Sequence, residues 1–151
     1  MIIVTKNFDE IEIDDDKIIQ FPAGIIGFPN LTDFALIHDD EKGTGSVHWL
    51  QSIQEPAFAM PVMDPLIVCQ EYNPVIDDEV FAPIGSLVDN EMLILVTLTV
   101  PRKIEEMSVN LRAPIIINAT AKKACQVILE DNRYAIKFPI YDILNQGKEG
   151  E

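Results

Sequence analysis

Short stretches of apolar residues, some alternating with polar ones and some unbroken, follow one another along most of this chain. The densest region lies between Met92 and Leu129. Its first part, Met92–Val100, is apolar throughout at the start and gains a polar face at Thr97 and Thr99. This pattern predicts a strand that is buried on both faces at its start and on one face at its end.

Two more apolar sets follow in the same region. The first alternates between positions 109 and 117, and Pro114 interrupts it, which predicts a kinked strand or two short strands. The second is Gln126–Leu129. Because none of these sets has a clear helical period, the region predicts a mainly antiparallel β core. The residues expected in that core are Val109, Leu111, Ile115, Ile117 and Trp49.

The rest of the chain predicts further strands separated by polar turns and by proline or glycine. They are an N-terminal hairpin of Ile2–Val4 with Ile11–Ile13, then Ile18–Phe21, Asp33–His38, Val47–Ile53, Phe58–Met63 and Tyr134–Phe138. Pro61 predicts an edge or a bulge in its strand, because proline has no N–H for the ladder. In the loop Phe21–Pro29, the apolar Ile25, Ile26 and Phe28 are expected to fold back onto the core.

Two places favour a short helix. Asp77, Asp78 and Glu79 suit a first helical turn, where carboxylates meet the positive end of the helix dipole. Pro139–Asn145 is the second place, with its proline at the start. The prediction is therefore an all-β fold, barrel-like or a closed sandwich, with one or two short helices. Residues 1–145 are expected to form one domain, and residues 146–151 a flexible tail.

Charge divides the chain unevenly. The net charge is -14, and residues 1–80 hold 16 of the 25 acidic residues but only 3 of the 11 lysines and arginines. Such a surface repels phosphate and anionic lipid, so we expect no direct binding of nucleic acid or membrane. Two interpretations remain open, which are solubility alone and a docking face for a basic protein.

The first residues, Met1–Lys6, lack a basic region followed by a long apolar run, so no secretory signal is expected and a cytoplasmic location is predicted. The two cysteines, Cys69 and Cys125, are expected to be free, buried thiols. His38 and His48 fall in separate strands without the spacing of metal ligands. No nucleophile elbow, phosphate-binding loop or dinucleotide motif occurs, so the sequence predicts no enzyme, metal or cofactor.

Several peptides in a fixed order then point to one family. They are Ile19–Phe28, Trp49–Ser52, Met63–Pro65, Val96–Pro101, Met107–Asn118 and Gln126–Leu129. The most specific part is Asn-Leu-x-Ala-Pro-Ile at Asn110–Ile115, followed by Gln-Val-Ile-Leu. Over nearly its whole length the chain resembles the FliW family of flagellar assembly factors. It departs from the family at Ala23, where lysine is common, and at Ile26, where proline is common.

The resemblance implies a compact all-β protein of the bacterial cytoplasm without catalytic activity. It implies two partners bound in turn: flagellin, through its C-terminal region, and CsrA, a small basic RNA-binding dimer that represses translation of flagellin mRNA. Family members relieve that repression when exported flagellin leaves them free to bind CsrA. In the family this antagonism acts away from the RNA-binding surface of CsrA.

The residues themselves suggest an interface in the acidic segment, where carboxylates accompany two aromatic rings. The predicted protein-binding residues are Glu71, Tyr72, Asp77, Asp78, Glu79 and Phe81. A merely solvated helix is the competing interpretation of the same segment. Two other functions also remain open, a small-ligand-binding β-barrel with Trp49 lining a cavity, and a hydrolase or lyase built on surface carboxylates.

Overall fold

The computed structural model describes residues 2–5, 9–38, 47–74, 79, 84, 92–130 and 133–143. The strands of the first half are β1 (Ile2–Thr5), β2 (Asp9–Glu12), β3 (Ile18–Gln20), β4 (Asp33–His38), β5 (Val47–Ser52) and β6 (Ala59–Met63). Those of the second half are β7 (Met92–Thr99), β8 (Ser108–Val109), β9 (Ile115–Asn118), β10 (Lys123–Gln126) and β11 (Phe138–Pro139). Short 3₁₀ helices are η1 (Asp15–Lys17), η3 (Pro65–Ile67) and η5 (Ile104–Glu106).

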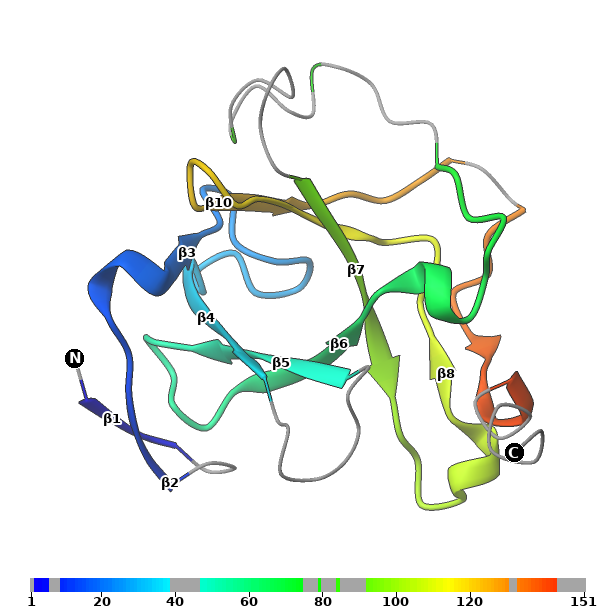
Figure 1. Ribbon diagram of the computed structural model, residues 1–151, viewed down its shortest axis with the longest axis horizontal. Helices are drawn as coiled ribbons and strands as arrows, with labels where there is room; N and C mark the ends of the chain where they lie inside the picture. The colour runs from blue at the N-terminus through cyan, green and yellow to red at the C-terminus, as the bar shows by residue number, and fades with distance from the viewer. Residues whose placement is uncertain are drawn as a thin grey trace.

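Among the described residues, seven strands close into a barrel (Figure 1). Neighbouring strands follow the order β3, β4, β5, β6, β7, β9 and β10, and β10 returns to β3. Every pair is antiparallel except the closing one, in which Lys123 of β10 lies opposite Gln20 of β3 in parallel. The predicted mainly antiparallel, barrel-like fold is therefore confirmed. Closure pairs the strands with one another around the ring and so protects their edges.

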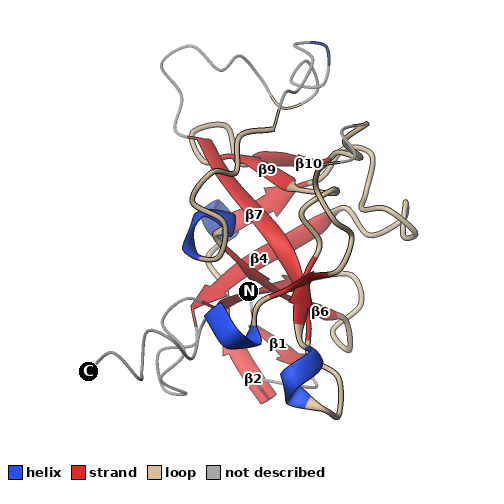
Figure 2. Ribbon diagram, turned by 90° about the vertical axis from the view of Figure 1, so that its right-hand side faces the viewer, coloured by secondary structure: helices blue, strands red, loops and turns tan. Residues whose placement is uncertain are grey.

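The remaining strands lie outside the ring. β8 pairs with the end of β7, and β11 pairs with β8, so both extend the sheet beyond the barrel. β1 and β2 form a separate antiparallel hairpin in which Ile3 lies opposite Ile11, which confirms the predicted N-terminal hairpin. Figures 1 and 2 show this hairpin below and outside the barrel strands.

The molecule has two apolar cores, one inside the barrel and one outside it. The inner core contains Ile19, Phe21, Ile25, Phe34, Leu50, Val62, Leu95, Ile115, Ile117 and Ala124. The outer core covers the far side of β7 and contains Met63, Val68, Tyr72, Val96, Leu98, Val109, Leu111, Leu129, Tyr134 and Ile140. Successive side chains of a strand point to opposite faces, so a strand between two cores is apolar at every position.

β7 shows this arrangement most clearly. Leu95 points into the barrel, whereas Val96 and Leu98 belong to the outer core. Leu95 and Val96 in the middle of the strand are buried, whereas Leu93 near its start is 44% exposed. The prediction of a strand buried on both faces is thus correct for the centre of β7 but wrong for its start, which lies at a groove.

Most predicted strands agree with the structure within a residue or two, but two do not. The predicted strand Gln126–Leu129 is wrong, because β10 ends at Gln126. Beyond it, Val127 and Leu129 donate backbone N–H groups to the loop carbonyls of Pro114 and Arg112. The predicted strand Tyr134–Phe138 is also wrong, because β11 begins only at Phe138.

Pro61 and Pro114 act as their chemistry predicts. β6 pairs with β7 only through Val62 and Met63, so Pro61 lies beyond the paired residues on that side. Pro114 separates β8 from β9, which confirms two short strands instead of one long strand.

Two asparagines hold the turns around β9. Asn110 accepts hydrogen bonds at Oδ1 from the backbone N–H groups of Arg112 and Ala113, at 3.0 and 3.2 Å. Asn118 is fully buried, and its Oδ1 accepts from the N–H groups of Thr120 and Ala121, both at 3.1 Å. These side chains satisfy turn backbone groups that would otherwise lack partners.

Trp49 is not a core residue, contrary to the prediction. It is half-buried and lies opposite Ile37 of β4 and Pro61 of β6. Its neighbour Leu50 points into the barrel, so Trp49 points to the outer face. The other predicted core residues, Val109, Leu111, Ile115 and Ile117, are buried as expected.

The loop after β3 folds back only in part. Ile25 is buried in the inner core, but Ile26 and Phe28 are 46% and 47% exposed, contrary to the prediction. The Phe28 ring instead contacts the Phe58 ring, with centroids 4.8 Å apart.

The predicted helices fall largely outside the described residues. Asp77 and Asp78 are among the residues not described, as is the tail 146–151. Of the predicted helix Pro139–Asn145, residues 139–143 are described. Pro139 belongs to β11, so the predicted start at this proline is wrong, whereas Tyr141–Ile143 is helical. Within the described part of the chain, no helix has the length and apolar character needed to span a membrane.

Candidate protein-binding groove

The six predicted interface residues differ in their placement. Glu71 and Glu79 are exposed, as an interface residue requires. Tyr72 is only 6% exposed and belongs to the outer core. Asp77, Asp78 and Phe81 lie outside the described residues. The interface therefore stays a prediction for all six residues, and the burial of Tyr72 leaves only a small part of its ring at the surface.

Tyr72 is held by contacts within the chain. Its hydroxyl donates a hydrogen bond to the carbonyl oxygen of Leu111 at 2.8 Å. Its ring meets that of Tyr134 edge to face, with centroids 4.7 Å apart, and the Tyr134 hydroxyl accepts from the N–H of Asn73 at 3.0 Å. Burial, with the neighbouring Tyr134, raises the pKa of Tyr72 far above its ordinary value. The phenol therefore remains a neutral hydrogen-bond donor that fixes the segment 72–74 to the barrel.

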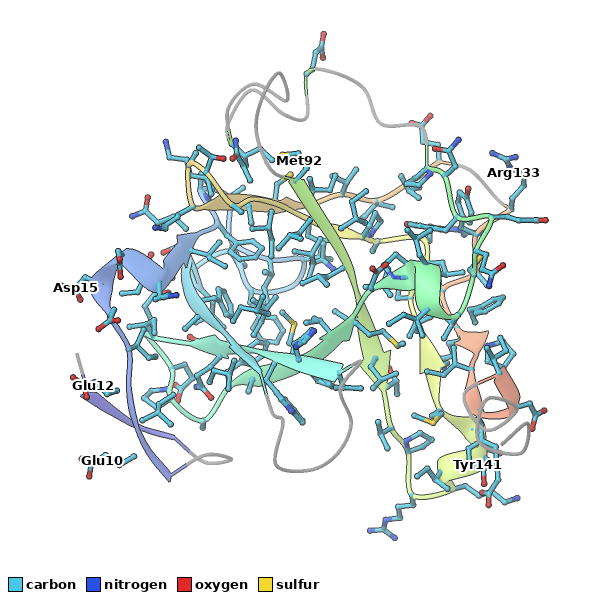
Figure 3. The ribbon with its side chains drawn as sticks, viewed as in Figure 1. Glu10, Glu12, Asp15, Met92, Arg133 and Tyr141 are labelled. Carbon is cyan, nitrogen blue, oxygen red and sulfur yellow. The ribbon has the colours of Figure 1, made fainter. Side chains whose placement is uncertain are left out.

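This fixed segment forms one wall of a surface groove. The groove has a volume of about 330 Å³ and lies between η3, the segment 72–74 and the first half of β7. Its lining is mostly apolar and consists of Asp64, Pro65, Leu66, Tyr72, Asn73, Pro74 and Met92–Leu95. Leu66 and Leu93 are 51% and 44% exposed, so the groove presents uncovered aliphatic surface. Figure 3 labels Met92, the first residue of β7, at the start of this strand.

The position of η3 beside β7 follows from its cap. Asp64 precedes the helix, and its Oδ1 accepts a hydrogen bond from the N–H of Leu66 at 2.9 Å. Pro65 occupies the first helical position, where its missing N–H costs nothing. The turn diverts the chain away from β7 directly after β6. The groove opens where a continued β6 would have paired with the start of β7.

A second hollow of about 350 Å³ lies on another part of the surface. It is lined by Ile11, Glu12, Ile13, Asp14, Lys17, Ala35, Leu36 and Ile37. These residues come from β2, the following turn, η1 and β4, so the hollow separates the N-terminal hairpin from the barrel wall. It shares no lining residue with the first groove.

The described histidines, cysteines and carboxylates are spread over the molecule. Among them, no group of three or more His, Cys, Asp and Glu residues is placed to hold a metal ion. His38 and His48 lie opposite each other on neighbouring strands. Neither Cys69 nor Cys125 forms a disulfide, and both are only half-buried, which corrects the predicted burial. Burial raises the pKa of the Cys125 thiol, so this thiol is less reactive than an exposed one.

The barrel interior is a packed core, with Phe21, Phe34 and Leu50 each fully buried in it. The rings of Phe21 and Phe34 meet edge to face, with centroids 5.2 Å apart. Trp49, which a ligand-binding barrel would have placed in a cavity, lies on the outer face instead. Side-chain filling of this kind argues against the small-ligand interpretation.

Among the described residues, a filled barrel with two apolar hollows outside it has the features of the class of protein-binding domains. The family comparison is specific. The model of the FliW protein family matches residues 2–140, and the chain belongs to this family of flagellar assembly factors.

The relatives agree over nearly their full lengths. The flagellar assembly factor FliW of Lachnoclostridium phytofermentans is 42% identical over 94% of this chain and 92% of its own. That of Lachnospira eligens is 43% identical over 97% and 98%. A crystal structure of the flagellar assembly factor FliW superposes with a TM-score of 0.85 at 28% identity, over 93% of this chain and 97% of that one.

Proposed function

We propose that this chain binds flagellin and the translational repressor CsrA in turn, and that it thereby relieves repression of flagellin mRNA translation in the cytoplasm. The observation that carries the proposal is the match to flagellar assembly factors over residues 2–140. The resemblance of the chain to this family supplies both partners. No catalytic step is part of the proposed role, which consists of protein binding alone.

The charge of the chain supports one of the two partners directly. A protein with a net charge of -14 attracts a basic RNA-binding protein and accelerates its association. Once bound, the same charge repels the phosphate backbone of an mRNA. The affinity of CsrA for RNA then falls without any need for this chain to cover the RNA-binding surface.

The groove beside β7 suits the other partner. Its walls are largely aliphatic, and its exposed Leu66 and Leu93 gain most from covering by an apolar segment. We therefore assign the groove to flagellin. Glu71, next to Tyr72 at the groove, and the exposed Glu79 contribute charge in the same part of the chain.

The test is a single added charge in the groove. Leu66→Lys is expected to weaken flagellin binding by about tenfold or more, because an ammonium group must lose its water when the groove is covered. The stability of the fold should change little, because Leu66 is half exposed. Binding of purified flagellin is measured by isothermal titration calorimetry.

Ile128→Lys provides the matched control, because Ile128 is 64% exposed and does not line the groove. This variant should bind flagellin as the original chain does. Equal affinities for both variants would remove the groove from the flagellin interface. Absence of flagellin binding by the unaltered chain would refute the proposed function itself.

A further inference from the structure

The outer face of β4, β5 and β6 carries an apolar row that the fold does not use in its inner core. Ile37, Trp49 and Pro61 lie directly opposite one another on these three strands. Opposite residues of antiparallel strands share a face, so the three side chains form one continuous row. All three are half-buried. The alternate row, Leu36, Leu50 and Met60, packs in the barrel.

The row continues into the second hollow. Ile37 belongs to both, and the hollow adds Ile11 from the hairpin and Ala35 from the barrel wall. Ile13, which also lines the hollow, is only 6% exposed. Its buried side chain anchors the start of the turn between the hairpin and the barrel. A hollow of about 350 Å³ accommodates one or two large side chains of a partner.

Acidic residues surround this apolar surface on the hairpin side. Glu10, Glu12 and the three aspartates at 14–16 are all exposed, and Glu12 and Asp14 line the hollow itself. Lys17 also lines the hollow and is the single basic residue of the stretch 9–17, so acidic residues outnumber it there. Figure 3 shows Glu10, Glu12 and Asp15 along one outer side of the molecule. An apolar centre with an anionic rim is complementary to a basic segment that carries an apolar anchor.

From this arrangement we infer a docking face formed by Ile37, Trp49, Pro61 and the hollow, with Glu12 and Asp14 as its rim and with Glu10 adding charge from the same strand as Glu12. Its occupant is a Lys- or Arg-rich protein segment that inserts an aliphatic or aromatic side chain between the hairpin and β4. Tryptophan is the residue most often found at the energetic centre of protein interfaces. The inference rests on the proposed function for the identity of the partner, which is the basic CsrA.

This inference competes with the prediction that the acidic segment around Glu71 and Glu79 receives the basic partner. The described part of that segment borders the mainly aliphatic β7 groove. Counting described residues alone, the hairpin face has more exposed carboxylates and also a half-buried tryptophan, and so it fits a cationic partner better. The two surfaces share no lining residue, so variants can separate them.

The first measurement uses the chain's single tryptophan. The chain is labelled with 5-fluorotryptophan, which gives one ¹⁹F NMR resonance, and unlabelled CsrA is added. We expect the Trp49 resonance to shift or broaden in proportion to the complex formed. Calorimetry on the same samples measures binding independently of the label.

The second measurement compares two charge reversals of equal size. Glu10→Lys with Glu12→Lys is expected to slow CsrA association by about tenfold or more, because steering depends on the rim charges. Glu71→Lys with Glu79→Lys changes the net charge equally and should slow it by no more than about twofold. Ile37→Glu adds no positive charge but removes an apolar contact, so it should mainly speed dissociation. Circular dichroism checks that each variant is folded.

Three outcomes distinguish the possibilities. A shifted Trp49 resonance with the larger effect at Glu10 and Glu12 supports the hairpin face. Binding of CsrA that leaves the resonance unmoved, or that responds as much to the Glu71 and Glu79 reversal, overturns the inference and leaves the proposed function standing. No binding of CsrA to the unaltered chain overturns both.

Discussion

Replacing Gly24 by alanine is expected to lower the free energy of unfolding by about 3 to 5 kcal/mol. Gly24 lies in the loop between β3 and β4 with a φ of 70°, a conformation that costs an L-residue energy. A Cβ there would also meet Pro29 Cα and O at 2.6 Å and Phe28 O at 2.7 Å. These are backbone atoms, so no side-chain rotation relieves the clash.

The damage would spread from this loop into the inner core. The N–H of Gly24 donates to the carbonyl oxygen of Phe21 at 2.8 Å, and Ile25 directly after it is buried at 4% exposure. A displaced loop withdraws Ile25 from the core and disturbs the fully buried Phe21. The loss would be a large fraction of the stability of an ordinary domain.

Gly27→Ala is the matched control in the same loop. Gly27 has a φ of 88°, but a Cβ at this position meets nothing within 4 Å. Only the conformational cost remains, and the expected loss is about 1 to 2 kcal/mol. Urea denaturation of both variants measures the difference. Similar losses for the two would mean that the close approach of Gly24 to Pro29 is not a constraint on the fold.

The second large effect is expected at Gln51, a fully buried residue of β5. Its Nε2 donates to the carbonyl oxygens of Ser52, Pro56 and Phe58, at 3.0, 2.9 and 3.1 Å. Among the described residues its Oε1 has no hydrogen-bond partner. Gln51→Glu replaces the donor with a carboxylate that faces carbonyl oxygens, and should lower the unfolding free energy by about 4 kcal/mol at pH 8.

The loss should depend on pH in one direction. Burial and the surrounding carbonyls raise the pKa of the introduced carboxyl in the folded state above its unfolded value of about 4.3. The unfolded chain then releases its proton at lower pH than the folded chain does. Stability therefore falls as the pH rises from about 4.3 through the folded pKa, and the penalty is smallest below about pH 4.3.

Gln54→Glu controls for the change in charge. Gln54 is exposed, and its Oε1 accepts from the N–H groups of Thr32 and Asp33 at 2.7 and 3.0 Å. A carboxylate keeps this accepting role, so we expect a change within about 1 kcal/mol. Urea denaturation at pH 8 and pH 5, relative to the original chain at each pH, tests both variants. A loss at Gln51 that is equal at both pH values would refute the buried-donor explanation.

The strands could be predicted from the sequence because a buried strand has a local pattern of apolar residues. β4, β5 and β7 appear as runs of the right length, since alternation and β-branched residues are properties of neighbours in the chain. Barrel closure has no such local pattern, because it pairs Lys123 with Gln20, which are far apart in the sequence. Gln126–Leu129 was mistaken for a strand because an apolar segment that packs in the outer core has the same composition as a paired one.

The candidate sites were less accessible to sequence reasoning for the same reason. The excess of acid in the first half can be seen in the sequence, and it fits both solubility alone and a basic partner. The burial of Tyr72 cannot be seen in the sequence, because it depends on contact with Leu111, which lies 39 residues away. Trp49 looked like a core residue because alternation fixes which residues share a face but not which face points inward. Both hollows form between segments distant in the sequence.

The most direct test of protein binding as the function is a translation assay with purified components. Flagellin mRNA is translated in the presence of enough CsrA to repress it, and the chain is then added. We predict that translation recovers in proportion to added chain, and that excess flagellin restores repression. Recovery should weaken as salt rises, because screening reduces attraction between acidic and basic surfaces. Repression that persists at a large excess of the chain over CsrA would contradict the proposed role.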